Sequence, residues 1–195
     1  MPAELKAGTF LIASMELDYI PSFTRTVVLI LQYAPEEGTQ GVIINRPLGD
    51  QVKLYSTREL QQLAEGFETS EEETGKIFFQ GGPVALGSLF FLHRLDHEGT
   101  QILQGLYAGG DLEVIRTHTA VLDPESPLLR FYLGYAGWDA GQLENEIAMG
   151  SWILCPGNAE LVFSEHTDTI WQQALFSLGD KYRTLSFVPE DPSVN

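Results

Sequence analysis

Two apolar segments that face each other across an acidic turn place the strongest constraint on this fold. Residues 25–31 read Arg-Thr-Val-Val-Leu-Ile-Leu, and residues 41–47 read Gly-Val-Ile-Ile-Asn-Arg-Pro. The first segment is apolar at consecutive positions, which is typical of a strand covered on both faces. Residues 35–38, Pro-Glu-Glu-Gly, turn the chain, and the β-branched second segment favours pairing back. The sequence therefore predicts a hairpin at the centre of a buried sheet.

Shorter patterned segments predict the rest of the fold. Apolar runs and alternation predict strands at residues 9–13, 76–80, 88–93, 100–103, 106–108, 128–135 and 151–155. Capping patterns and helical spacing predict helices from Ser56 to about residue 65, after Asp139, and at residues 170–178. Residues 111–120 fit either a short helix or a loop.

The order of these elements indicates the architecture. Strands do not alternate regularly with helices, and the chain has no internal repeat or Ser/Gly linker. We therefore expect an α+β fold, with a largely antiparallel sheet or partly closed barrel and about three flanking helices. One domain should span residues 1–195, with a loose tail from about residue 189.

Charge and composition narrow the possible partners and the compartment. Eleven basic and 27 acidic residues give a net charge of −16, and this field repels phosphate backbones and anionic membranes. Residues 65–73 carry five glutamates and are expected to form a solvated loop. No segment approaches the roughly 20 apolar residues of a spanning helix. With one cysteine and no secretory pattern at the N-terminus, we expect a cytoplasmic protein that binds neither nucleic acid nor membrane directly.

The side chains that commonly bind metals or act as nucleophiles do not form a recognisable set. Only His93 and His97 are close among the histidines, and four residues along a strand separate two side chains by about 13 Å. Cys155 lies in an apolar segment, where burial raises the pKa of a thiol. Neither a Gly-x-Ser-x-Gly elbow nor a lysine-containing phosphate loop is present. We therefore expect no metal site and no cofactor, and the sequence assigns no catalytic residue.

Two arginines at strand ends and a glycine pair form a candidate ligand site. Arg25 begins an apolar strand, where a guanidinium group needs an anion. Arg46 is held extended by the proline that follows it, and Asn45 offers both donor and acceptor atoms. Gly81 and Gly82 fit either a tight turn with positive φ angles or a backbone nest for an anion. If these groups converge, they predict a pocket for a small anionic ligand.

Internal ion pairing is the alternative use of Arg25 and Arg46. Glu144 and Glu146 follow Asp139 on a predicted helix and are candidate partners. Either carboxylate would act as a general base only if the fold buries it. Convergence of the two arginines, and the donors that they keep free, decide between a ligand site and ion pairs that hold the fold.

Four motifs occur in a fixed order along the chain. They are residues 23–31, residues 41–47, Phe-Gln-Gly-Gly-Pro-Val at 79–84, and Gly-Tyr-Ala-Gly-Trp-Asp-Ala-Gly-Gln-Leu-Glu at 134–144. They resemble the AlgH/YqgE family of small bacterial proteins, whose biochemical activity is not established. The resemblance runs from about residue 8 to residue 179 and implies the fold of that family. It departs from the family pattern at Ile20, where an aspartate is common, and at residues 13–15, which lack a common proline.

The positions that the resemblance highlights include His93 as well as the arginine cluster. The candidate ligand-binding residues are Arg25, Asn45, Arg46, Gly81, Gly82 and His93. We expect a non-catalytic binding or regulatory module that acts through a small anionic ligand or a protein partner. The alternative is an enzyme that acts on a small polar substrate with His93 and a carboxylate.

The resemblance also raises the question of gene regulation, because members of the family are sometimes labelled transcriptional regulators. A chain of net charge −16 without a basic recognition helix lacks the electrostatic attraction on which DNA binding depends. Direct DNA binding is therefore not expected, whereas regulation through a protein partner is compatible with the sequence. The sequence leaves the oligomeric state open.

Overall fold

The predicted central hairpin is present in the computed structural model. Strands β2 (Val27–Ala34) and β3 (Gly38–Ile43) pair antiparallel, and the first four residues of β2 are all buried. The structure describes residues 3–49, 77–118 and 128–185. The helix expected at residues 56–65, the acidic loop at 65–73 and the tail from residue 189 lie outside this part of the chain.

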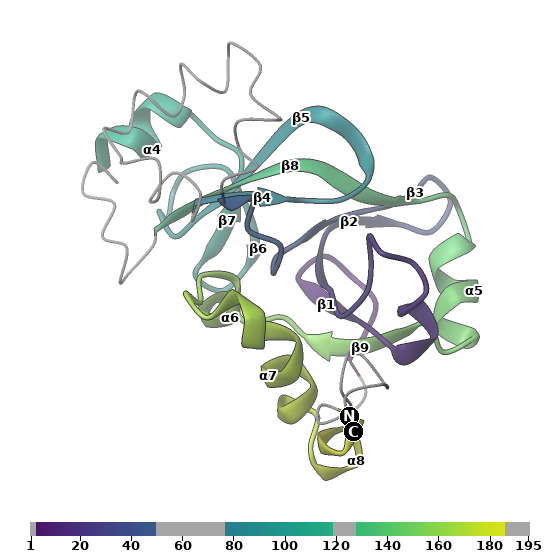
Figure 1. Cartoon of the computed structure of the whole chain (residues 1–195). Coiled ribbons are helices and arrows are strands. Elements are labelled where there is room, and N and C mark those ends of the chain that lie inside the picture. Colours follow the sequence, from purple (N-terminus) through teal and green to yellow (C-terminus); the bar gives the residue numbers. More distant parts are fainter. Residues whose placement is uncertain (1–2, 50–76, 119–127, 186–195) are drawn as a thin grey trace.

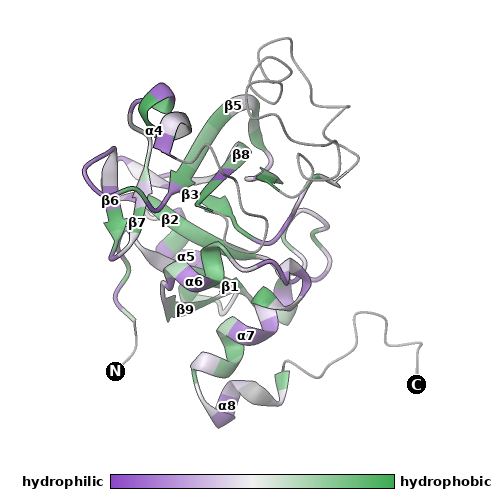
Figure 2. Ribbon diagram, turned by 90° about the vertical axis from the view of Figure 1, so that its left-hand side faces the viewer, coloured by the Kyte–Doolittle hydropathy of each residue, from purple (hydrophilic) through white to green (hydrophobic). Residues whose placement is uncertain are grey.

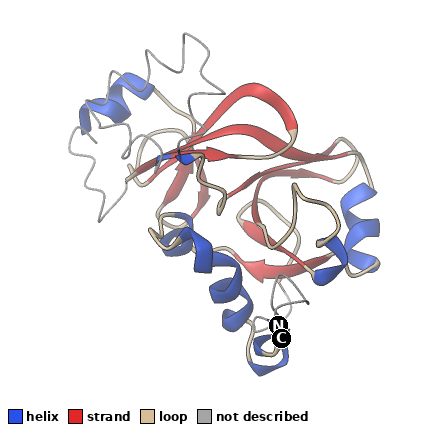
Figure 3. Cartoon of the chain, in the orientation of Figure 1, coloured by secondary structure: helices blue, strands red, loops and turns tan. Residues whose placement is uncertain are grey.

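The other strands extend from this hairpin into a curled sheet (Figure 3). Their bounds are β1 (Thr9–Ala13), β4 (Phe78–Gln80), β5 (Val84–His93), β6 (Thr100–Leu103), β7 (Leu106–Ala108), β8 (Leu129–Trp138) and β9 (Trp152–Pro156). The order β6-β7-β5-β8-β3-β2-β1-β9 contains antiparallel neighbours throughout, and β4 adds a parallel pair with β8. The structure thus confirms an α+β domain with a largely antiparallel, partly closed sheet.

Five α-helices lie among the described residues, whereas the sequence predicted about three. They are α4 (Leu112–His118), α5 (Gln142–Ala148), α6 (Ala159–Val162), α7 (Ile170–Ser177) and α8 (Asp180–Arg183). Periodicity did not reveal α6 and α8 because each has four residues. Helix α5 ends at Ala148 with Met149 as its C-cap, and the predicted stop residue Gly150, with a φ of 86°, follows directly. Its N-cap is Gly141, with a φ of 75°, in place of the predicted Asp139. None of the described helices has the length and apolarity needed to cross a membrane.

Helices cover both faces of the curled sheet (Figure 1). Phe10 and Leu29 belong to one core with Trp171 of α7, and the next residue on β1, Leu11, belongs to a second core with Leu143 of α5. A third core joins β4 and β8 to α4. Figure 2 shows the strands largely in the hydrophobic colour, as expected for a sheet covered on both sides.

Strand β8 joins the two halves of the sheet. It pairs with β5 along one edge and with β4 and β3 along the other. The sequence predicted one apolar face, from Leu129 to Tyr135, but the opposite face is buried as well and carries Arg130 and Tyr132. Both faces are buried because helices cover each of them, as the core memberships of Phe131 and Tyr132 indicate.

Candidate functional site

The structure brings Arg25, Asn45 and Arg46 together where β2 begins and β3 ends. Asn45 is buried; its Oδ1 accepts a hydrogen bond from the Val27 amide at 2.9 Å, and its Nδ2 donates to the Arg25 carbonyl at 2.9 Å. Arg46 donates from Nη2 to the carbonyl of Thr24. Two side chains after β3 therefore hold the backbone that leads into β2.

Arg25 has a left-handed backbone conformation, with a φ of 49°. Residues other than glycine rarely adopt this region, because Cβ approaches the following carbonyl oxygen. The bond from Arg46 to the Thr24 carbonyl and the bond from Asn45 to the Arg25 carbonyl lie on either side of this φ angle and hold the conformation in place. The guanidinium group lies 5.1 Å from the ring centroid of Trp171, whose indole nitrogen donates to the carbonyl of Ala13 at 2.9 Å. The backbone and the side chain of Arg25 are both positioned by contacts from distant parts of the chain.

Gly81 and Gly82 lie beside this cluster, and close backbone packing accounts for both. The Gly81 amide donates to the Leu133 carbonyl at 2.7 Å, and the Gly81 carbonyl accepts a bond from β3 at 2.8 Å. A Cβ on Gly81 would lie 2.3 Å from the oxygen of Gly134, and one on Gly82 would lie 2.1 Å from the carbonyl carbon of Tyr135. Because the Gly81 amide is bound within the sheet, it does not contribute to the anion nest considered from the sequence.

His93, the remaining candidate, is fully buried near the end of the sheet formed by β5 and β7. Its Nε2 donates to the Gly109 carbonyl at 2.9 Å, and its Nδ1 accepts a bond from the Leu95 amide at 3.2 Å. The ring also stacks on Tyr107, with 5.9 Å between centroids. Burial lowers the pKa of His93, although its hydrogen bonds to backbone act in the opposite direction. The bonding pattern is that of a neutral imidazole whose two nitrogens are both used by the fold.

His93 does not converge with the arginines. It pairs in the sheet with Leu129, which belongs to the core beneath α4. The guanidinium group of Arg25 instead covers Trp171, a residue of the core beneath α7. Residues paired across neighbouring strands share a face of the sheet, so the candidate set divides into the cluster around Arg25 and a separate histidine.

The carboxylates of α5 accept hydrogen bonds from tyrosine and tryptophan side chains. The Tyr33 hydroxyl donates to Glu144 Oε1 at 2.8 Å, and this bond raises the pKa of Tyr33. Trp138 and Trp152 donate their indole hydrogens to Glu146 Oε2 at 2.9 Å and 2.7 Å. The carboxylates considered as internal partners of Arg25 and Arg46 are thus used to anchor α5 on the sheet.

Arg130 was not a candidate from the sequence, yet only 2% of its surface is exposed. It donates to the carbonyls of Val162 and Ser164, both at 2.6 Å, and its guanidinium group lies 4.5 Å from the ring centroid of Phe79. Burial lowers the pKa of Arg130. A cation at the carbonyl end of a helix satisfies backbone acceptors that lack partners within the helix. The signal in the sequence was a charged residue inside the apolar segment 128–135.

The remaining groups that could carry chemistry are few. Within the ranges that the structure describes, no group of three or more His, Cys, Asp or Glu side chains is placed to hold a metal ion. Cys155 is buried, as predicted, with its Sγ 3.2 Å from the Ser177 hydroxyl oxygen. Burial raises the pKa of this thiol, which lowers its thiolate fraction.

Comparisons with known proteins agree with this fold. A family model described as AlgH-like, DUF179, matches residues 10–183. Relatives named UPF0301 protein include one from Chlorobium luteolum, 38% identical over 98% of this chain and 95% of that one. Another, from Bacteroides fragilis, is 36% identical over 89% of this chain and 84% of the relative.

Two solved structures are also similar to this chain. The solution structure of the AlgH protein from Pseudomonas aeruginosa matches with a TM-score of 0.64 and 28% identity, covering 97% of each chain. The X-ray structure of a Corynebacterium diphtheriae protein has a TM-score of 0.70 at 22% identity, covers 96% of this chain and 95% of that one, and shows the same fold. Since the family model spans most of the sequence and relatives above 30% identity cover nearly all of it, the chain belongs to the AlgH-like family.

Proposed function

We propose that this protein is a non-catalytic binding module whose Arg25–Arg46 cluster takes a small anion, a carboxylate or a phosphate. The observation that supports this most strongly is the left-handed φ of 49° at Arg25, held by the two hydrogen bonds of Asn45. Rarely populated conformations at residues other than glycine concentrate at ligand sites, where the surrounding structure holds them. Here the held residue carries a guanidinium group, which matches the geometry of carboxylate and phosphate oxygens.

The position of Arg46 supports the same proposal. Its guanidinium group reaches the carbonyl of Thr24, so it lies next to the segment that carries Arg25. Two cationic groups from neighbouring segments therefore lie close together in a chain of net charge −16 and make the potential locally more positive. An anion that is repelled by most of the surface is attracted at this position.

An enzymatic role for His93 has less support from its surroundings. General acid–base catalysis needs a ring nitrogen within reach of a substrate proton. Both nitrogens of His93 bond to backbone groups, and the side chain is fully buried. These two bonds give His93 a role in stabilising the fold, so its presence does not require catalysis. This favours the binding module over the enzyme.

A thermal-shift screen tests the proposal. Inorganic phosphate, citrate and a panel of small carboxylate and phosphate metabolites are compared at equal ionic strength with native protein, Arg46→Ala and Arg94→Ala. A ligand at 100 times its Kd stabilises a protein by about 2.7 kcal/mol, which corresponds to roughly 5–10 °C for a chain of this size. We expect that rise in native protein and in Arg94→Ala, and its loss in Arg46→Ala.

The Arg94→Ala variant is the matched control, because it removes the same charge from a surface ion pair with Glu160. Each variant is compared with its own melting temperature in the absence of ligand, so a loss of stability from the missing Arg46 bond does not enter the comparison. An anion that raises the melting temperature of all three proteins equally would place its site elsewhere. A panel without any stabilising anion would contradict the proposal.

A further inference from the structure

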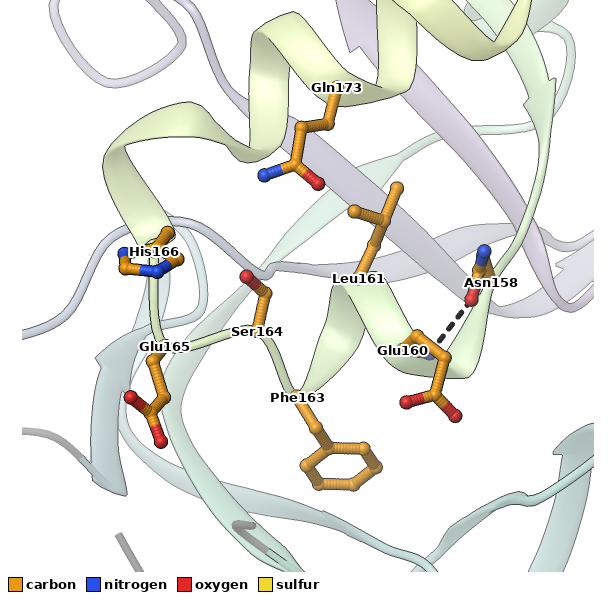
Figure 4. Close-up of a pocket in the computed structure, with 8 residues that line it drawn as sticks. All are labelled: Asn158, Glu160, Leu161, Phe163, Ser164, Glu165, His166 and Gln173. Carbon is orange, nitrogen blue, oxygen red and sulfur yellow. Dashed lines mark hydrogen bonds between the residues drawn. The ribbon is translucent and has the colours of Figure 1, made fainter. Parts of the chain in front are cut away.

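A hollow of about 590 Å³ lies between α6, the turn that follows it and α7 (Figure 4). Its volume is in the range of small-molecule sites, about 300–1,000 Å³. Leu161 and Phe163 supply apolar surface. The polar lining consists of Asn158, Glu160, Ser164, Glu165, His166 and Gln173. The lining itself holds two carboxylates and neither lysine nor arginine. Glu160 pairs with Arg94, which lies outside the lining, so Glu165 supplies the charge that favours a cation.

One part of the lining, Glu160 and Phe163, already contacts a guanidinium group of the protein itself. Arg94 donates from both terminal nitrogens to the two oxygens of Glu160, at 2.8 Å and 2.9 Å. Its guanidinium group lies 4.8 Å from the ring centroid of Phe163, and its bond with Glu160 lowers the pKa of that carboxyl. A carboxylate next to an aromatic ring recognises a planar cation. Arg94 therefore shows within the molecule which chemistry this wall accepts.

Glu165 provides a second carboxylate, on the other side of Phe163 from Glu160 in Figure 4. It is exposed, and it forms no ion pair within the part of the chain that the structure describes. Gln173 donates from Nε2 to the Thr169 hydroxyl at 2.7 Å, which leaves its amide oxygen as an acceptor. The hollow thus offers a carboxylate and a neutral acceptor beyond those that Arg94 uses.

The floor of the hollow is fixed from below. Arg130 donates to the carbonyls of Val162 and Ser164, which flank Phe163 in the sequence. A site whose backbone is tied to the sheet loses little conformational entropy when a ligand binds. The short segment between α6 and α7 therefore provides a preorganised surface.

We propose that this hollow binds a guanidinium group, carried by a small molecule or by an arginine side chain of a peptide. Glu160 and Glu165 supply the opposite charge, and the amide oxygen of Gln173 accepts a hydrogen bond. Arg94 shares Glu160 with the ligand and so weakens its binding. This site takes a cation and is separate from the anion site at Arg25 and Arg46.

Titration with two probes tests this proposal. Methylguanidinium and the capped peptide acetyl-Gly-Arg-Gly-amide are titrated into native protein, Glu165→Gln, Arg94→Ala and Glu36→Gln, with binding followed by NMR chemical shifts. Native protein should bind saturably, and less tightly as salt rises. Glu165→Gln should weaken binding about two- to fivefold, as expected for a solvent-exposed charge pair. Arg94→Ala should strengthen binding by a similar factor, because it leaves Glu160 unpaired.

The control variant Glu36→Gln removes the same charge from the exposed turn between β2 and β3, and it should bind both probes as native protein does. Binding of both probes identifies a free guanidinium group as sufficient, whereas binding of the peptide alone identifies an arginine-bearing peptide as the ligand. The proposal is overturned if neither probe binds saturably. It is also overturned if Glu36→Gln and Glu165→Gln weaken binding equally, since that result indicates general attraction to an acidic chain.

Discussion

At the scale of single residues, Arg25 occupies a backbone conformation that glycine adopts more readily. The left-handed region costs residues with a Cβ about 1–2 kcal/mol. Asn45 holds this conformation through the Arg25 carbonyl and the Val27 amide, and Trp171 packs against the guanidinium group. An arginine at a position that suits glycine indicates that the side chain has a role that offsets the backbone cost.

Replacement of Arg25 by glycine and by alanine separates these two contributions. Both substitutions remove the guanidinium group, but only glycine relieves the backbone at a φ of 49°. We expect Arg25→Gly to be more stable than Arg25→Ala by about 1 kcal/mol in urea unfolding. Equal stabilities would mean that the backbone relaxes to a common conformation once the side chain is absent.

His93 gives the protein a predictable dependence on pH. Burial lowers its pKa in the folded state, whereas a histidine in the unfolded chain has a pKa of about 6.5. As pH falls through about 6.5, the unfolded state takes up a proton that the folded state does not, so the free energy of unfolding decreases. Stability from this residue is therefore present above that pH and is lost below it.

Urea unfolding between pH 7.5 and 5.5 measures this effect. Native protein should lose about 1 kcal/mol over this range from His93, and His93→Gln should lack that loss. His97→Asn is the control, since His97 is exposed and asparagine tolerates its positive φ of 75°. A native pH dependence that persists unchanged in His93→Gln would show that other groups cause it.

At the scale of elements, the contact between the segment before β5 and strand β8 organises the sheet. The chain passes Gly81 and Gly82 against β8 so closely that a Cβ at either position would overlap backbone atoms. Gly134 of β8 has a φ of 69° at the same contact. The glycine pair thus allows β4 to lie parallel to β8 on one edge, while β5 pairs antiparallel on the other.

Alanine substitution distinguishes this contact from an ordinary glycine. Gly81→Ala places Cβ 2.3 Å from a backbone oxygen that has no room to move, so we expect a loss of at least about 3 kcal/mol. Gly87→Ala, on the exposed part of β5, meets no atom within 4 Å and should change stability by less than about 0.5 kcal/mol. Chemical denaturation of both variants is the measurement, and similar stabilities would contradict the proposed role of the glycine pair.

At the scale of the whole molecule, the net charge of −16 affects every encounter with a partner. We expect small anions, which approach one point of the surface, to be attracted by a local pair of cations such as Arg25 and Arg46. A nucleic acid presents phosphates over a much longer distance and therefore meets the repulsive field of the whole chain. Small anions and DNA should consequently behave differently toward this protein.

Titration with double-stranded DNA at low salt tests this difference. Screening is weakest there, so any attraction to phosphates would be strongest. We expect no saturable change in the fluorescence anisotropy of a labelled duplex at protein concentrations up to about 100 μM. Nonspecific DNA binding usually has a Kd of about 1–100 μM, so this titration would detect it. Saturable binding that weakens with added salt would show that the charge argument is wrong.

The sequence by itself determined the elements whose signals are local. Consecutive apolar residues predicted β2 and its partner β3, and apolar residues at helical spacing predicted α7. Each pattern is local because it records which side chains of one segment are buried. The order of the four motifs along the chain also indicated the family. The sequence left open whether Arg25 and Arg46 converge. The hairpin brings the end of β3 to the beginning of β2 and so places Asn45 and Arg46 beside Arg25.

Only the tertiary structure decided which distant residues share a site. It placed His93 on the opposite face from the arginine cluster, tied the Gly81 amide to β8, and buried Arg130 beneath α6. A sequence pattern indicates that one face of a segment is buried, but it does not indicate which other segment buries it. The pairing of strands and the close approach of backbones depend on contacts between residues far apart in the chain. For that physical reason the central hairpin followed from periodicity, whereas the partners of each candidate side chain required the folded molecule.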